Sequence, residues 1–420
     1  MSSPAQMVLP DSAIRLTPER REAVARLESW LARGVTGYAR RRNFDFGNGD
    51  RDNVSTLSPY VRHRLVLEEE ILAATLDRYP LRRVEKFVQE VFWRTYFKGW
   101  LEHRPGVWRA YTRDLRQHID ELDSDAGLRA NYDAAVQGRT GIDCFDVWVQ
   151  ELLTTGYLHN HARMWFASIW MFTLRLPWEL GADFFMQHLL DGDAASNTCS
   201  WRWVAGLHTQ GKTYLARASN IREYTAGRFN PENQLASSAT PLSGLLPPRP
   251  QAVPAADAVP VDGDFGILLT DDDCDPVSLR FDHSPRPCLA LQTAALRSPM
   301  GVAPLVRAFS AGALEDAQRR LATKTQQPPT EMLSVDSADG VVQWVRRAAL
   351  QTLVVAAPPQ GPGADLLTDV ESRLAMHDVR LLRLRRPYDD LVWPYARKGF
   401  FGLKKQIPAL LAQLGLGADA

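Results

Sequence analysis

The stretch from Asp191 to Gly206 reads DGDAASNTCSWRWVAG and brings polar and aromatic residues close together. Its first thirteen residues hold two carboxylates, Asp191 and Asp193, the amide of Asn197 and two indoles. An EF-hand calcium loop would need a full ligand series and a closing glutamate, and the stretch has neither. Taken alone, the stretch offers polar and aromatic groups suited to binding and leaves the ligand open.

The sequence before this stretch has the apolar spacing of helices. Apolar residues recur every three to four positions in several segments, and strand-like alternation is absent. The segment 161–174 is apolar nearly all round, which is typical of a helix buried inside a domain. We therefore predict one all-α domain over residues 16–231, after a loose tail at 1–15. The helical segments are residues 19–31, 65–76, 84–100, 145–153 and 161–174.

After residue 231 the pattern changes twice. Residues 232–263 are rich in proline, which predicts a semi-extended linker. Over residues 264–397, short apolar runs alternate with helix-like segments, which favours a Rossmann-like α/β domain with a parallel sheet. No GxGxxG or P-loop is present. Residues 398–420 form a basic, aromatic helical extension. The expected strands are 266–270, 288–291, 332–335, 353–356 and 379–384, and the expected helices are 302–322, 340–349 and 366–376.

Composition excludes several classes of protein. The chain has 420 residues with 49 Lys plus Arg and 49 Asp plus Glu, which excludes a bulk polycation but not a local basic patch. Its four cysteines form no CxxC pair, which argues against a disulfide scaffold and fits a reducing compartment. No apolar run reaches about 18 residues, and no signal peptide is evident. We expect a cytoplasmic protein that does not span a membrane.

Two further motifs carry candidate chemistry. Residues 53–60, NVSTLSPY, place hydroxyl groups before a proline at an expected helix start, which suits an anion site or simply a helix cap. In Glu90-Val-Phe-Trp-Arg94, the acid, Trp93 and Arg94 share one helical face. These three side chains either line a ligand pocket or form an intrahelical ion pair beside a core tryptophan.

A third motif, residues 155–164, reads TGYLHNHARM. Asn160, Arg163 and Met164 share one face, and polar groups that lead an apolar helix need buried partners. His159 and His161 lack a further ligand at suitable spacing, so we predict no metal site.

In this order and at these separations, the motifs resemble the FAD-binding domain of the DNA photolyase/cryptochrome family. Five motifs agree over about residues 20–231, just over half the chain. The resemblance implies FAD held in a folded conformation inside a helical domain. The matching strings are STLSPYV, EVFWRTYF, GRTGIDCFDVWVQEL, TGYLHNHARM and DGDAASNTCSWRWVAG, ending in GRFNP.

The resemblance implies a role for each matching residue. Thirteen positions would contact FAD. Among them, Asn197 would face flavin N5, where an amide supports reduced or semiquinone flavin. Trp93 and Trp203 would wall a pocket for a cyclobutane pyrimidine dimer, with Glu90 and Met164 contacting it. The lesion would be flipped from the duplex and split by light-driven electron transfer from reduced FAD. The implied FAD contacts are Tyr38, Ser55, Thr56, Leu57, Ser58, Phe87, Glu90, Arg94, Asn160, Arg163, Asp191, Asp193 and Asn197.

The chain departs from the family pattern at several positions. Val54 and Phe87 replace a threonine and a tryptophan of the site, and His161 replaces an arginine, which weakens the expected DNA contact. Trp201 and Trp178 match the first two members of an indole relay for electron transfer. The third position falls in the polar stretch 118–126, which lacks an aromatic residue; the substitutes we considered are Tyr132, Trp165 and Trp170.

Domain order is the largest departure. Family members place an α/β antenna domain before the helical domain, whereas here an α/β pattern follows it, which suggests a circularly permuted antenna-like domain. A second, antenna chromophore stays open. We expect a monomeric photolyase-like lyase acting on damaged DNA. A cryptochrome-like blue-light receptor without repair activity is the alternative, and a relic without photochemistry is the third class considered.

Overall fold

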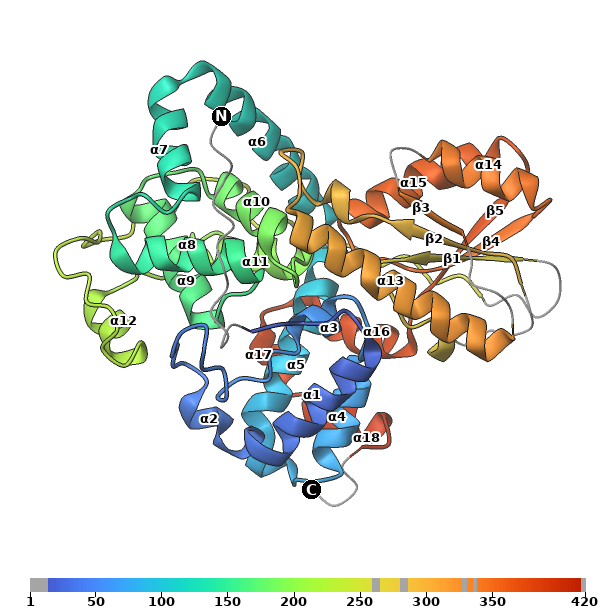
Figure 1. The fold of residues 1–420 in the computed structure, drawn as a ribbon, viewed down its shortest axis with the longest axis horizontal. Coiled ribbons are helices and arrows are strands. Elements are labelled where there is room, and N and C mark those ends of the chain that lie inside the picture. The colour runs from blue at the N-terminus through green and yellow to red at the C-terminus, as the bar shows by residue number, and fades with distance from the viewer. Residues whose placement is uncertain (1–13, 259–264, 280–285, 327–330, 335–337, 417–420) are drawn as a thin grey trace.

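The computed structural model describes residues 14–258, 265–279, 286–326, 331–334 and 338–416. Helices fill the first part of the chain, and every strand follows residue 265 (Figure 1). The expected fold class, an all-α part followed by a parallel α/β part, is confirmed. The helices of the first part are α1 (Arg20–Arg33), α2 (Tyr38–Arg41), α3 (Ser58–Arg62), α4 (Glu68–Leu76), α5 (Leu81–Glu102), α6 (Pro105–Ser124), α7 (Ala126–Val136), α8 (Asp143–Thr155), α9 (Asn160–Ser168), α10 (Trp178–His188), α11 (Ala194–Val204) and α12 (Ala218–Tyr224).

Local sequence explains where the helices near the site begin and end. Asp193 caps α11 by accepting a hydrogen bond from the Ser196 amide at 2.7 Å. Gly156 ends α8 with a φ of +66°, a conformation that favours glycine. The helix expected over 161–174 is α9 followed by a π-helical turn, η2 (Ile169–Thr173), which the apolar spacing did not indicate. No helix in the described ranges is long and apolar enough to cross a membrane.

The second part is a five-stranded parallel sheet in the order β3-β2-β1-β4-β5. Leu268 of β1 lies opposite both Leu289 of β2 and Val355 of β4. One long helix, α13, covers one face, while α14 and α15 cover the other (Figure 1). The elements are β1 (Gly266–Thr270), η3 (Pro276–Ser278), β2 (Cys288–Gln292), η4 (Ala294–Arg297), α13 (Pro304–Thr325), β3 (Glu331–Ser334), α14 (Asp339–Arg347), β4 (Thr352–Ala356), α15 (Pro362–Ala375) and β5 (Arg380–Leu384).

The two faces of the sheet belong to two different cores. Because side chains alternate along a strand, Leu268 faces α14 and α15 in a separate apolar cluster, whereas Ile267 and Leu269 face α13. The α13 side is continuous with the core of the helical part. One apolar core therefore joins the two parts of the chain.

The chain between and after the two parts is held by specific contacts. Residues 232–258 contain no helix or strand, yet Gln251 exchanges hydrogen bonds with His103 of α5's C-terminal end. After β5 the chain returns to the helical part and packs along α5, where Trp393 lies so close to Gly99 that a Cβ would approach it to 2.8 Å. The returning elements are α16 (Pro387–Val392), η5 (Trp393–Arg397), α17 (Phe400–Lys404) and α18 (Ile407–Gln413).

Candidate functional site

A buried cluster of carboxylates and guanidinium groups forms where α5, α9 and the start of α11 meet. Arg163 holds Asp191 through two hydrogen bonds of 3.0 Å each. Arg94 of α5 lies 3.9 Å from Asp191 and 3.9 Å from Asp193. Burial by itself raises the pKa of Asp191, but Arg163 and Arg94 lower it below its ordinary value. Both acids are therefore ionised at neutral pH.

Arg94 keeps hydrogen-bonding capacity that the protein does not use. Its Nη1 is buried and has no hydrogen-bond partner among the residues that the structure describes, and its two ionic contacts are long. A buried N–H without an acceptor is costly, so this position suits a ligand that accepts from it. The adjacent Ser196 Oγ is also buried without a partner. The cluster thus offers one cationic donor and one hydroxyl to a polar ligand.

The hydroxyl-rich loop, residues 54–58, runs from this cluster to a cavity. Ser58 lies within hydrogen-bonding reach of Asp191, and Leu57 is buried in the core. Thr56 has a φ of +53°, and its Oγ1 accepts a hydrogen bond of 3.1 Å from Arg26. Val54, Ser55 and Thr56 line one side of a cavity of about 340 Å³.

That cavity is lined by arginines. Arg26 is balanced by Glu22, and Arg51 pairs with Asp45 and Glu151. Arg33 and Arg41 have no carboxylate partner among the residues the structure describes. The cavity therefore has a positive lining beside the Ser55 and Thr56 hydroxyl groups, which already make hydrogen bonds within the loop. The positive charge of such a lining suits a phosphate-bearing ligand. The expected anion site at residues 55–58 fits this surrounding.

An aromatic group and a second ion pair flank the N-terminal half of α5. Tyr38 packs against Phe87 with ring centroids 5.6 Å apart. Glu90 forms an ion pair with Arg42 and not with Arg94, so the alternative of an intrahelical Glu90–Arg94 pair is wrong. Burial raises the pKa of Glu90, and Arg42 and Lys86 partly offset this. The three adjacent arginines at 40–42 do not indicate in the sequence that Arg42 pairs with Glu90.

The residues expected to wall a lesion pocket occupy different surroundings. The indole of Trp93 is stacked on Phe400 of α17, whose ring centroid lies 3.7 Å away. Trp203 is 36% exposed and stacks on Tyr214 at 5.7 Å. Met164 is half-buried, and Asn160 is exposed at the start of α9. Within the described part of the chain, the rings of Trp93 and Trp203 make no contact with each other. That a ligand binds between them stays a prediction.

Asn197 and Trp201 lie one turn apart on α11. Asn197 Nδ2 donates to the Ala182 carbonyl at 2.8 Å, which leaves Oδ1 as the atom able to accept from a ligand. Trp201 is buried, and its Nε1 has no partner. Its ring meets Trp170 at 6.3 Å, and Trp170 in turn meets Tyr132 at 6.0 Å.

Trp178, expected as the next indole after Trp201, belongs to another aromatic group. Its ring lies 5.5 Å from Tyr111, which lies 5.3 Å from Trp108. Trp165, also considered for the relay, stacks on Trp148 and His161. The aromatic contacts thus connect Trp201 to Trp170.

The two histidines of the 155–164 motif are used internally. His159 Nδ1 accepts from the His161 amide, and His161 bridges the Asn43 carbonyl and the Tyr214 hydroxyl at 2.9 and 3.1 Å. Over the described ranges, no group of three or more His, Cys, Asp or Glu side chains could hold a metal ion.

A separate ionic network fills the carboxyl ends of β1 and β4. In doubly wound sheets this end, where the strand order diverges, is the usual ligand crevice. Here Asp272 pairs with Arg62 at 2.8 Å, and Asp273 pairs with Arg64 at 3.1 Å and Arg386 at 2.7 Å. The crevice is therefore occupied by the junction with the helical part.

Glycine lets the loop after β4 approach this network. A Cβ on Gly363 would lie 2.1 Å from Asp272 Oδ2, and one on Gly361 would lie 2.8 Å from the Ala194 Cβ. Gly361 also has a φ of +154°. The Gly-Pro-Gly segment is thus a close contact between the two parts at the start of α15.

Comparisons with known proteins agree with the helical part. Residues 87–236 match the family model described as the FAD binding domain of DNA photolyase. The deoxyribodipyrimidine photo-lyase of Streptomyces griseus is 30% identical over 268 residues, which cover 58% of this chain and 57% of that one. The Neurospora crassa photo-lyase is 29% identical over 201 residues, covering 46% and 32%. A class III photolyase structure from Agrobacterium tumefaciens covers 50% of this chain and 43% of that one, with 23% identity and a TM-score of 0.42.

The family-model match places the similarity to the FAD binding domain of DNA photolyase in the helical part of the chain. The chain is similar through that part to DNA photolyases, and the curated relatives named above are photo-lyases. It spans between a third and just over half of the length of the three curated relatives it matches first, which are all photo-lyases.

Proposed function

We propose that the chain binds FAD and repairs cyclobutane pyrimidine dimers in DNA by light-driven electron transfer. The observation that carries the proposal is the guanidinium of Arg94, held between Asp191 and Asp193 with a buried donor left over. When bound, reduced FAD supplies an electron to the dimer on illumination and recovers it after the two cyclobutane bonds have opened.

The residues present fit FAD on physical grounds. The diphosphate would take the hydroxyls of Ser55 and Thr56 and the positive charge of Arg33 and Arg41. Arg94 and Ser196 would donate to polar atoms of the cofactor. Asn197 Oδ1 would accept a hydrogen bond from a protonated flavin nitrogen, because Nδ2 already donates to the Ala182 carbonyl.

The lesion would lie between Trp93 and Trp203. Their indoles would provide flat apolar walls for the two linked pyrimidines flipped out of the duplex, and damaged bases cost less to extrude than intact ones. Glu90 would contact the dimer bases, with Arg42 partly offsetting the rise in its pKa that burial causes. Met164 and Asn160 would add one apolar and one polar contact.

One observation favours the second candidate, a blue-light receptor without repair. His161 stands where the family resemblance implies an arginine, and only 9% of it is exposed, with its ring stacked on Trp165 at 4.0 Å. This position is therefore used for internal packing and gives no cation to DNA.

The α/β part would not bind a second chromophore at the usual crevice. The ionic network of Asp271–Asp273 fills that end of the sheet. An antenna chromophore in a permuted antenna-like domain would therefore bind elsewhere on the sheet or its helices.

The test is a repair assay with the whole chain loaded with FAD. Reduced protein and an oligonucleotide carrying one thymine dimer are illuminated, and restored thymines are measured by chromatography. We expect repair by the wild type and a clear loss in Glu90→Gln, while Glu371→Gln, at an exposed glutamate of α15, repairs normally. Bound FAD without repair in the wild type would leave the receptor as the function, and a colourless protein that takes up no FAD would contradict both.

A further inference from the structure

The C-terminal residues 393–413, here called the strap, concentrate positive charge. They contain Arg397, Lys398, Lys404 and Lys405 and no aspartate or glutamate. The whole chain has as many acidic as basic residues, so this segment departs strongly from the average. It also lies outside the residues 87–236 that match the family model.

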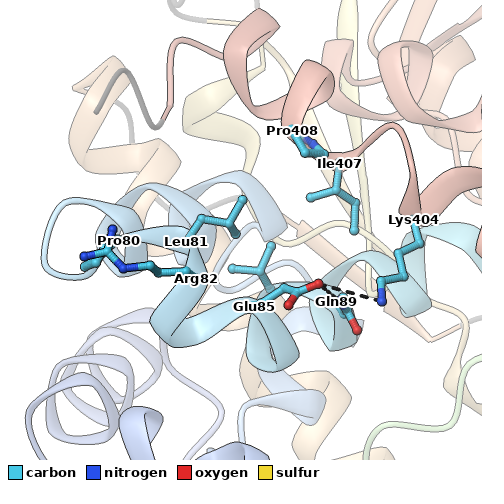
Figure 2. Close-up of a pocket in the computed structure, with 9 residues that line it drawn as sticks. Pro80, Leu81, Arg82, Glu85, Gln89, Lys404, Ile407 and Pro408 are labelled. Carbon is cyan, nitrogen blue, oxygen red and sulfur yellow. Dashed lines mark hydrogen bonds and ion pairs between the residues drawn. The ribbon is translucent and has the colours of Figure 1, made fainter. Parts of the chain in front are cut away.

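The strap is anchored along α5 beside the candidate lesion wall. Phe400, Leu403 and Ile407 are buried on its inner side. The Phe400 ring stacks on Trp93 with an angle of 13° between the two planes. Lys404 reaches Glu85 at 3.7 Å at the rim of a groove of about 340 Å³ between α5 and α18, as Figure 2 shows. This packing fixes the strap relative to Trp93.

The outer side of the strap carries an aromatic ring among cations. Phe401 follows Phe400 directly and is 75% exposed. Lys405 lies four residues on, on the same side of the turn, and Arg397 and Lys398 precede it, all exposed. None of these three cations has a carboxylate within ion-pair distance among the described residues. A single exposed phenylalanine is common on protein surfaces, but here the ring stands among three cations without carboxylate partners in the described residues.

This combination matches single-stranded nucleic acid. Aromatic side chains stack on any base, and unpaired lysines and arginines neutralise backbone phosphates. An anionic membrane fits less well, because α17 and α18 bury their apolar sides against α5 and expose no broad apolar face.

We propose that the strap is a nucleic-acid contact, in which Phe401 stacks on a base and Lys398 and Lys405 bind phosphates of the strand beside the Trp93 wall. The strap would provide a local positive surface on a chain whose net charge is zero. The identity of the strand rests on the proposed function: it would be single-stranded or locally opened DNA next to a lesion.

The experiment measures binding by fluorescence anisotropy at several salt concentrations. FAD-loaded protein is titrated with two labelled oligothymidine probes, one undamaged and one carrying a thymine dimer. The test variant is Phe401→Ala with Lys398→Gln and Lys405→Gln. The control is Met376→Ala with Arg380→Gln, since Met376 is 74% exposed and Arg380 is exposed on the α/β part.

We expect the strap variant to bind both probes about tenfold or more weakly, with a salt slope lower by about 1.4, since each single-strand phosphate contact contributes about 0.7. FAD content and the control variant should match the wild type. Equal loss on both probes without any wild-type preference for the dimer would support the strap and contradict the repair function. If the wild type prefers the dimer probe and the strap variant binds both probes as tightly as the wild type, the strap proposal is wrong and the repair function is not affected. Strap-dependent capture of phosphatidylserine vesicles without DNA binding would overturn it in favour of a membrane contact.

Discussion

Trp201 meets Trp170 edge to face, with ring centroids 6.3 Å apart and planes at 88°. Tyr132 then meets Trp170 at 6.0 Å. Among the described residues, the Trp201 ring thus contacts Trp170 and not Trp178, the indole that the family resemblance implies as the next member of the relay. Which of the two carries the electron stays a prediction.

Replacing Trp170 should slow photoreduction of bound, oxidised FAD. We expect Trp170→Phe to lower the rate at least tenfold, because phenylalanine is much harder to oxidise than tryptophan, and Trp178→Phe to have a smaller effect. Transient absorption under blue light with an external reductant measures both. A rate lost in Trp178→Phe and kept in Trp170→Phe would return the relay to the path through Tyr111.

Replacing Arg94 should release FAD. Arg94→Gln removes the cation that faces Asp191 and Asp193 and the donor that lacks a partner in the protein. Hydrogen bonds to charged groups contribute about 1.5–3 kcal/mol, so affinity should fall by about ten- to a hundredfold. The flavin-to-protein absorbance ratio after dialysis measures this. Arg113→Gln, at an exposed ion pair, should retain FAD like the wild type.

Breaking the network between the two parts should lower stability. Arg64 and its partners Asp273 and Asp389 are buried, and removing one member leaves uncompensated charge. We expect Arg64→Ala to reduce the free energy of unfolding by about 3–5 kcal/mol. Denaturant unfolding gives the value, and Arg78→Ala, which breaks the exposed pair with Glu28, should cost about 1 kcal/mol or less. Equal losses would contradict the role assigned to the network.

His118 should make stability depend on pH. Hydrogen bonds with Glu179 and Glu121 raise the pKa of His118 from 6.5 to about 9. A raised histidine pKa means that the folded state holds the proton more tightly, so the stabilisation is complete below about pH 6.5 and is lost as the pH rises through about 9.

The comparison is between wild type and His118→Gln in urea at pH 6 and pH 9.5. The difference in free energy of unfolding should be largest at pH 6 and shrink at pH 9.5. His377→Gln, at an exposed histidine, should show no such trend. A difference that is constant with pH would contradict the assignment.

The sequence predicted what depends on local pattern. Apolar periodicity located α1, α5 and α8 and all five strands, because helix and strand spacing is a property of neighbouring residues. The five motifs located Arg94, Arg163 and the acids they contact in the structure.

Contacts between distant residues could not be predicted in this way. Nothing near Glu90 indicated that its partner would be Arg42, and nothing near Trp93 indicated that Phe400 would stack on it from more than 300 residues away. The same holds for Trp170, whose place beside Trp201 depends on how α10 and the π-helical turn meet, with Gly181 giving the two indoles room. Such pairings depend on tertiary packing, which a single sequence does not encode in its spacing.

The apolar core that runs from the helical part under α13 has a consequence for how the molecule holds together. Its two parts are joined by packed side chains and buried ion pairs, so the peptide connection through residues 232–258 contributes mainly proximity. Two separately expressed fragments, divided within that connection, should therefore associate non-covalently and form the same complex of helical and α/β parts. The same independence from connectivity would let the order of the two parts along the gene be exchanged while their interface is kept.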